Sequence, residues 1–165
     1  HPSERSLGDI MTQELTVGST APSLTLTDHN GHTVKLSEGH ESGVVVYFFP
    51  RAFTPGCTSE ACDFRDNLAA LTGQGYDVYG VSGDSPQELA RFAEEYNLPY
   101  TLLSDPGHDA ARTWGAWGER TINGETSVGP LRSTFVVNSD GTLRHAEYRV
   151  DAQGHVSRLL QELTD

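Results

Sequence analysis

The sequence from residue 44 to residue 57 reads Val44-Val-Val-Tyr-Phe-Phe-Pro-Arg-Ala-Phe-Thr-Pro-Gly-Cys57, and it predicts a strand, a short loop and the start of a helix. Residues 44–49 are all apolar and are β-branched or aromatic, which is typical of a strand buried on both faces. Thr54 and Pro55 form an N-cap and first-turn pair. We therefore expect Cys57 in the first turn of a helix that follows a central strand.

The flanking sequence alternates further strands with helices. Apolar residues at helical spacing predict that the helix after Thr54 runs to residue 71 and stops at Gly73. Asn30-Gly31 supplies positive φ angles for a hairpin turn near the N-terminus, and Asp140-Gly141 marks a second hairpin. The pattern predicts an α/β fold with a central mixed sheet flanked by helices. The other expected strands are 24–27, 33–36, 77–82, 101–104, 133–138 and 143–150, and the other expected helices are 86–96, 106–114 and 156–163.

Length and charge exclude several classes of protein. The 165 residues fit one domain of ordinary size. The chain carries 11 basic and 23 acidic residues, a net charge of −12, which argues against nucleic acid as a main partner. The longest apolar run, residues 44–49, is far shorter than the roughly 20 residues of a membrane span, so we expect no membrane partner. The seven histidines are scattered and show no ligand spacing, so we expect no metal site.

The N-terminal segment is set apart from this domain. Residues 1–10 precede the only methionine, Met11, and show no periodicity. We interpret residues 1–10 as a remnant of expression cloning and residues 11–165 as a single domain, with a native tail as the alternative. No signal-peptide pattern occurs before or after Met11, and two cysteines are too few for a disulfide scaffold, so we expect a cytoplasmic protein.

The expected position of Cys57 favours a reactive thiol. Free backbone N–H groups and the positive end of the helix dipole lie at a helix start, and both favour thiolate over thiol. The carboxyl ends of strands are also where α/β sheets place their sites. The alternative is an inert cysteine that only fills space in the core.

The second cysteine suggests a reaction in two steps. Cys62 lies five positions after Cys57, which places their Cα atoms roughly 8.6 Å apart in an ideal helix. A disulfide tolerates at most about 7 Å, so the pair cannot bond until one or two turns unwind. We hypothesise that Cys57 reacts first, the helix opens and Cys62 then attacks the oxidised sulfur. The alternative is that Cys62 simply packs as a small apolar residue.

These residues resemble a known family. Pro50-Xaa-Xaa-Xaa-Thr54-Xaa-Xaa-Cys57 resembles the active-site signature of the peroxiredoxins, and the run from Thr54 to Cys62 resembles their bacterioferritin-comigratory, or Q-type, branch. The resemblance implies a thioredoxin-like fold with peroxiredoxin additions. It also implies a bacterial antioxidant enzyme of cell redox homeostasis, which reduces hydrogen peroxide and organic hydroperoxides. No cofactor is implied.

The resemblance also implies roles for the two cysteines. Cys57 corresponds to the peroxidatic cysteine, whose thiolate attacks the O–O bond and becomes a sulfenic acid. Cys62 corresponds to the resolving cysteine of this branch. It would form an intramolecular disulfide that thioredoxin or a similar dithiol reductant then reduces.

Four further residues receive roles by resemblance. Thr54 would present its hydroxyl to the sulfur and the peroxide oxygens, and Pro50 would shield the pocket from water. The distant arginine of the family falls on Arg132, whose guanidinium would stabilise the thiolate and the leaving oxygen. Glu60 matches a position that braces this arginine. Arg51 is the competing cation, but it lies between motif positions and is expected to face solvent.

Other functions remain open at this point. A protein-disulfide oxidoreductase normally uses Cys-Xaa-Xaa-Cys, which is absent here. A redox sensor that relays oxidation to a partner would use the same two cysteines. A one-cysteine peroxidase, in which Cys62 is not resolving, is the third alternative. We expect a monomer, or at most a weak dimer, because no apolar stripe demands a partner.

Overall fold

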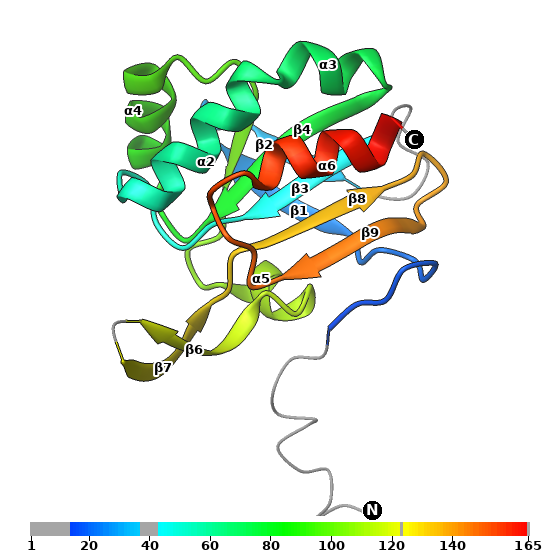
Figure 1. Ribbon diagram of the computed structural model, residues 1–165. Coiled ribbons are helices and arrows are strands. Elements are labelled where there is room, and N and C mark those ends of the chain that lie inside the picture. The colour runs from blue at the N-terminus through cyan, green and yellow to red at the C-terminus, as the bar shows by residue number, and fades with distance from the viewer. Residues whose placement is uncertain (1–13, 37–42, 123, 165) are drawn as a thin grey trace, which may run out of the picture.

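The computed structural model describes residues 14–36, 43–122 and 124–164, and the segment assigned to expression cloning lies outside these ranges. A central mixed sheet has the strand order β2-β1-β5-β4-β3-β8-β9 (Figure 1). β3 (Gly43–Phe48) pairs parallel with β4 and antiparallel with β8. The other strands of this sheet are β1 (Leu24–Asp28), β2 (Thr33–Leu36), β4 (Tyr76–Ser82), β5 (Thr101–Ser104), β8 (Ser133–Val137) and β9 (Leu143–Tyr148).

Helices cover both faces of the sheet, and the alternation of β3 shows why this strand is apolar throughout. Val45 and Tyr47 belong to one buried cluster, which includes residues of α2 (Pro55–Asp66), α3 (Leu68–Gly73), α4 (Pro86–Tyr96) and α6 (His155–Thr164). Val46 and Phe48 belong to a second cluster, which includes residues of α5 (Asp109–Thr113). In Figure 1, α2, α4 and α6 lie on one side of the sheet and α5 on the other. The strand predicted from residues 44–49 is therefore confirmed as central and buried.

The predicted single helix from Thr54 to residue 71 is wrong in one respect. It divides at Asn67, whose φ of −110° and ψ of 10° separate α2 from α3. The Asn67 side chain donates a hydrogen bond of 2.8 Å to the Asp63 carbonyl oxygen. Asparagine side chains compete for backbone groups in this way, and the apolar spacing of the helix could not reveal it.

Both predicted hairpins are present, but the first turn differs in detail. Gly31 has a φ of +87°, whereas Asn30 is not left-handed. The carboxylate of Asp28 accepts hydrogen bonds of 2.9 Å from the amides of Asn30 and His32, which hold the turn between the two strands. At the second hairpin Gly141 has a φ of +92°, as the Asp-Gly pair predicts.

The structure also contains a hairpin that the sequence analysis missed. β6 (Trp117–Ile122) and β7 (Glu125–Pro130) pair antiparallel in a two-stranded sheet of their own. The dipeptide Asn123-Gly124 was the available signal, and Gly124 has a φ of +83°. Figure 1 shows this hairpin projecting from the body of the molecule.

The remaining helices follow the sequence closely. α4 begins with a capping box, in which Ser85 and Glu88 each bind the other's backbone amide. α5 is shorter than the predicted 106–114, because the Asp105 carboxylate accepts from the amides of Ala110 and Ala111 and so fixes the start of the helix. Within the described ranges, no helix is long and apolar enough to cross a membrane.

Candidate active site

Cys57 lies in the first turn of α2, as the sequence predicts. The helix starts at Pro55, with Thr54 at the N-cap, a few residues after the end of β3. The Cys57 side chain is a free thiol and is 1% exposed. The elements therefore place one buried sulfur at the carboxyl edge of the sheet and at the positive end of a helix, an environment that stabilises an anion.

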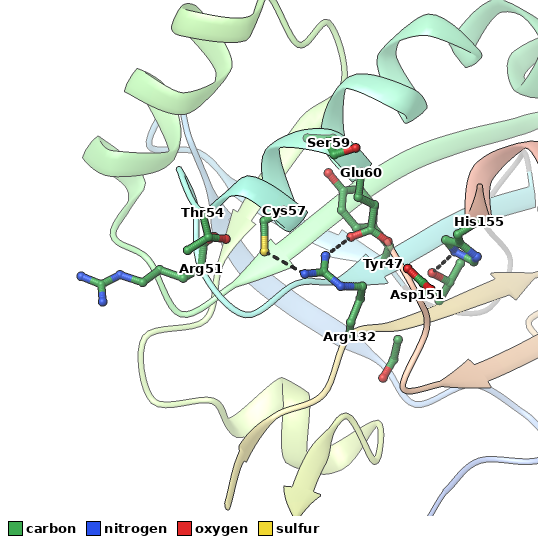
Figure 2. Close-up of polar contacts among 12 residues, drawn as sticks. Tyr47, Arg51, Thr54, Cys57, Ser59, Glu60, Arg132, Asp151 and His155 are labelled. Atoms are coloured by element: carbon green, nitrogen blue, oxygen red, sulfur yellow. Dashed lines mark hydrogen bonds and ion pairs between the residues drawn. The ribbon is translucent and has the colours of Figure 1, made fainter. Parts of the chain in front are cut away.

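Arg132 contacts this sulfur from a distant part of the chain. Its Nη2 donates to Cys57 Sγ at 3.4 Å, and its Nη1 donates to Glu60 Oε1 at 2.7 Å, as Figure 2 shows. The Arg132 side chain is only 15% exposed. One guanidinium thus binds the thiol and the carboxylate at the same time, in the geometry that the planar donor fork of arginine permits.

Glu60 is the buried partner of this arginine. Its side chain is fully buried, and burial raises its pKa to about 7 although the charge of Arg132 opposes the shift. Oε1 accepts from Arg132, whereas Oε2 is buried and has no hydrogen-bond partner among the residues that the structure describes. Burial acts to lower the pKa of Arg132, but the charges of Glu60 and Cys57 outweigh it and the net shift is upward. The guanidinium therefore stays charged beside the sulfur.

Gly56 makes room for the guanidinium, a role that the sequence analysis missed. A Cβ atom at Gly56 would lie 3.1 Å from Arg132 Nη2 and 3.7 Å from the Cβ of Ala152. Any side chain here would push against the arginine that contacts Cys57. The only sequence signal was the presence of the glycine directly before the cysteine.

Thr54 and Arg51 differ in how their side chains lie relative to the sulfur. Thr54 is the N-cap residue, but its hydroxyl donates to the Arg51 carbonyl oxygen at 2.8 Å and makes no side-chain cap to the helix. In Figure 2 the Thr54 side chain lies beside Cys57, whereas the Arg51 side chain points away from it. Arg51 is exposed, as expected.

A cavity of about 580 Å³ adjoins this group. Pro50 and Arg132 line it together with residues of the β6–β7 hairpin. Arg120 and Arg149 add two more positive side chains, against one negative side chain, Glu119. The β6–β7 hairpin therefore lines the cavity next to the Arg132 guanidinium.

Cys62 lies on the same helix as Cys57. It is a free thiol of intermediate exposure. Because α2 includes both residues, its geometry sets their Cα atoms about 8.6 Å apart, beyond the roughly 7 Å that a disulfide allows. The two thiols cannot bond while α2 is intact.

The two tryptophans of the chain pack against other aromatic rings. Trp114 is buried and packs against Phe48 and Phe135. The Trp117 ring packs against that of His108 in a tilted arrangement, with 4.8 Å between ring centroids. In the part of the chain that the structure describes, no group of three or more His, Cys, Asp or Glu side chains is placed to hold a metal ion.

The sheet, its helices and the buried thiol beside an arginine define a cysteine-based redox enzyme on an α/β fold. The sequence model of the AhpC/TSA family matches residues 17–146. The chain belongs to this family, among the Bcp/PrxQ peroxiredoxins, and is a thiol-dependent peroxidase.

Three relatives support this assignment. The chain is 44% identical to peroxiredoxin Bcp of Escherichia coli K12 over 131 residues, which cover 79% of this chain and 84% of that protein. It is 39% identical to peroxiredoxin Bcp of Bacillus subtilis over 149 residues, which cover 90% of this chain and 95% of that protein. The solved structure of the bacterioferritin comigratory protein of Xanthomonas campestris, studied for its alkyl peroxide reduction, is similar with a TM-score of 0.79 at 29% identity, covering 86% and 90%. The fold is accordingly thioredoxin-like, as predicted.

Proposed function

We propose that Cys57 is the peroxidatic cysteine. Its thiolate attacks one oxygen of a hydroperoxide, the O–O bond breaks, and the leaving oxygen takes a proton to give water or an alcohol. Cys57 becomes a sulfenic acid, oxidised by two electrons. The observation that carries this proposal is the Arg132 Nη2 contact with Cys57 Sγ at 3.4 Å.

Arg132 would stabilise charge throughout this step. A fixed guanidinium favours the thiolate before the attack and the negative leaving oxygen during it. Glu60, at 2.7 Å, would hold the guanidinium in place, and Gly56 would allow its approach. Thr54 would turn its hydroxyl toward the peroxide oxygens, and Pro50 would limit water at the sulfur.

Cys62 would resolve the oxidised sulfur. Its thiol attacks the sulfenic sulfur, an S–S bond forms and the hydroxyl leaves as water. Because the intact helix keeps the two Cα atoms too far apart, this step requires α2 to unwind locally. A thioredoxin-like dithiol would then reduce the disulfide and restore both thiols.

Substrates, assembly and location belong to the same proposal. Hydrogen peroxide and organic hydroperoxides would be reduced, and the cavity of about 580 Å³ beside Arg132 offers space for an organic substituent. Residues 11–165 would act as a single domain and a monomer. A disulfide that must be reduced in every cycle suits a reducing compartment, the cytoplasm.

A coupled assay tests this function. The protein is supplied with thioredoxin, thioredoxin reductase and NADPH, and peroxide-dependent NADPH oxidation is followed for the native chain, Cys57→Ser and Cys62→Ser. We expect many turnovers for the native chain, none for Cys57→Ser, and no sustained thioredoxin-dependent turnover for Cys62→Ser. Stoichiometric oxidation without turnover would contradict the enzyme and favour a redox relay, and full turnover of Cys62→Ser would show a one-cysteine mechanism.

A further inference from the structure

Two buried tyrosines bind the helix that carries both cysteines. Tyr100, which directly precedes β5, places its hydroxyl 2.9 Å from the Ala61 carbonyl oxygen of α2. Tyr47, in the middle of β3, places its hydroxyl 2.8 Å from that of Tyr100. Both side chains are buried, and no water is needed to complete the chain of contacts.

Only one assignment of donors and acceptors fits the hydrogen bonds that link Tyr47, Tyr100 and Ala61. A carbonyl oxygen can only accept, so the single hydroxyl proton of Tyr100 goes to Ala61. The hydroxyl of Tyr47 must then donate to the hydroxyl oxygen of Tyr100. Hydrogen bonds in such a buried chain polarise and strengthen one another.

The position of the acceptor links this chain to the reaction. The Ala61 carbonyl belongs to the peptide group that joins Ala61 to Cys62. That peptide must move when α2 unwinds to bring Cys62 to Cys57. If it moves away, Tyr100 keeps a buried donor without a partner, which is costly because water does not reach it.

A second tie on the same helix is weaker. Arg65 Nη1 donates to the Tyr96 carbonyl oxygen at 2.7 Å and so connects α2 to the end of α4. The Arg65 side chain is 31% exposed, so water can replace its partner when the contact breaks. The buried tyrosine contact therefore opposes unwinding more strongly than the arginine contact.

We propose that Tyr100 is a positioning residue for the resolving step, and that its hydroxyl holds the Ala61–Cys62 peptide in the helix and slows disulfide formation. This inference rests on the proposed roles of Cys57 and Cys62. A closed helix keeps Cys57 beside Arg132, ready for peroxide, but it delays the attack of Cys62.

The delay exposes the sulfenic acid to a competing reaction. In one outcome, Cys62 attacks, the S–S bond forms and water leaves. In the other, a second hydroperoxide oxidises the Cys57 sulfenate to a sulfinate and is itself reduced to water or an alcohol. The hydrogen bond of Tyr100 therefore sets how the oxidised enzyme divides between the disulfide and the sulfinate.

Tyr100→Phe removes the hydroxyl and keeps the ring that packs near Tyr47 and Phe64. After mixing with one equivalent of peroxide, we expect Cys57–Cys62 disulfide formation to be about fivefold faster than in the native chain, the effect of a typical net hydrogen bond on an equilibrium constant. Under excess peroxide, the sulfinate fraction found by mass spectrometry should fall. The double variant Tyr47→Phe/Tyr100→Phe, which leaves no tyrosine hydroxyl unpaired, should show the same acceleration.

Tyr79→Phe is the matched control, because Tyr79 packs against the cluster on the other face of the sheet. It should resolve at the native rate. Hydrogen exchange gives a readout that general destabilisation does not reproduce: Tyr100→Phe should speed amide exchange in α2 and leave the β3 amides protected.

The outcomes separate this inference from the proposed function. If the native chain forms no Cys57–Cys62 disulfide, the proposed function fails. If the native chain does form the disulfide, the role of Tyr100 can be tested. It is refuted if Tyr100→Phe and the double variant Tyr47→Phe/Tyr100→Phe form the disulfide at the native rate, with unchanged amide exchange in α2. Equal acceleration in Tyr79→Phe, or equal loss of protection in β3, would also refute it.

Discussion

The guanidinium of Arg132 lies 3.4 Å from the sulfur of Cys57, although the two residues are 75 positions apart in the sequence. The sheet produces this contact. β8 pairs antiparallel with β3 so that Ser133 lies opposite Phe48. Arg132, one residue before β8, therefore lies beside the loop that leads from β3 into α2. The backbone is fixed there by a hydrogen bond of 2.9 Å from the Val150 amide to the Arg132 carbonyl oxygen.

Because Arg132 contacts Cys57, we expect a large loss of peroxidase activity when the guanidinium is replaced. Arg132→Lys keeps a positive charge but lacks the planar guanidinium fork that contacts Cys57 and Glu60 at the same time. We expect kcat/KM for hydrogen peroxide to fall by about 100-fold or more, the usual effect of losing a fixed donor at a developing charge. Arg51→Lys, at the exposed arginine that points away from the sulfur, is the control and should react at nearly the native rate. Equal losses in both variants would contradict the assignment.

Gly56 offers a test of the same contact without touching a charged group. In Gly56→Ala the new Cβ would press on Arg132 Nη2 at 3.1 Å, and the arginine is already held by two partners. We expect kcat/KM to fall by about tenfold, since small displacements of a catalytic group are costly. Gly73→Ala is the matched change, because a Cβ there meets nothing within 4 Å. Native activity in Gly56→Ala would show that the guanidinium can move without consequence.

Glu60 should make stability depend on pH in a defined direction. Its pKa is raised to about 7 by burial, so the folded state favours the protonated form. The resulting stabilisation is complete below the ordinary pKa of about 4.5 and is lost as the pH rises through about 7. Relative to the native chain, Glu60→Gln should therefore gain free energy of unfolding between pH 5 and pH 8. Urea unfolding at the two values measures this, and a pH-independent difference would contradict the buried carboxylate.

His155 should act in the opposite direction. The His155 side chain is fully buried, and its Nε2 forms a hydrogen bond of 2.7 Å with the Thr134 hydroxyl. Burial lowers the pKa of His155 to about 4. A neutral histidine is thus favoured on folding. The stabilisation is complete above the ordinary value of 6.5 and is lost as the pH falls through about 4. His155→Gln should lose less stability than the native chain between pH 7 and pH 4, as urea titrations would show. If the native chain and His155→Gln lose the same free energy of unfolding over this range, the acid sensitivity arises from groups other than His155.

The sequence predicted what local signals encode. The apolar run of residues 44–49, the Thr54-Pro55 pair and the cysteine spacing placed β3, the start of α2 and both thiols. Arg132 was reached only through a family resemblance, because nothing near it in the sequence indicates which strand β8 pairs with. The division of α2 at Asn67 depends on one side-chain hydrogen bond, which an apolar pattern does not record.

Other features could not be predicted from the pattern of apolar residues. The β6–β7 hairpin is mostly exposed, so its strands lack the apolar alternation that marks a half-buried strand. The sequence analysis assigned no role to Tyr100, and only the structure shows that its hydroxyl donates to the Ala61 carbonyl oxygen. Close approaches such as that of Arg132 to Gly56 are likewise properties of packing between distant segments.

The central claim is that Cys57 is oxidised by peroxide and Cys62 resolves it. The most direct measurement is mass spectrometry of the reduced protein after one equivalent of hydrogen peroxide, with peptide mapping of both cysteines and trapping of sulfenic acid in Cys62→Ser. The account predicts a native product lighter by two hydrogens, a Cys57–Cys62 linkage, and a trapped sulfenic acid on Cys57 in the variant. A sulfenic acid on Cys62, or a native product with both thiols still free, would contradict it.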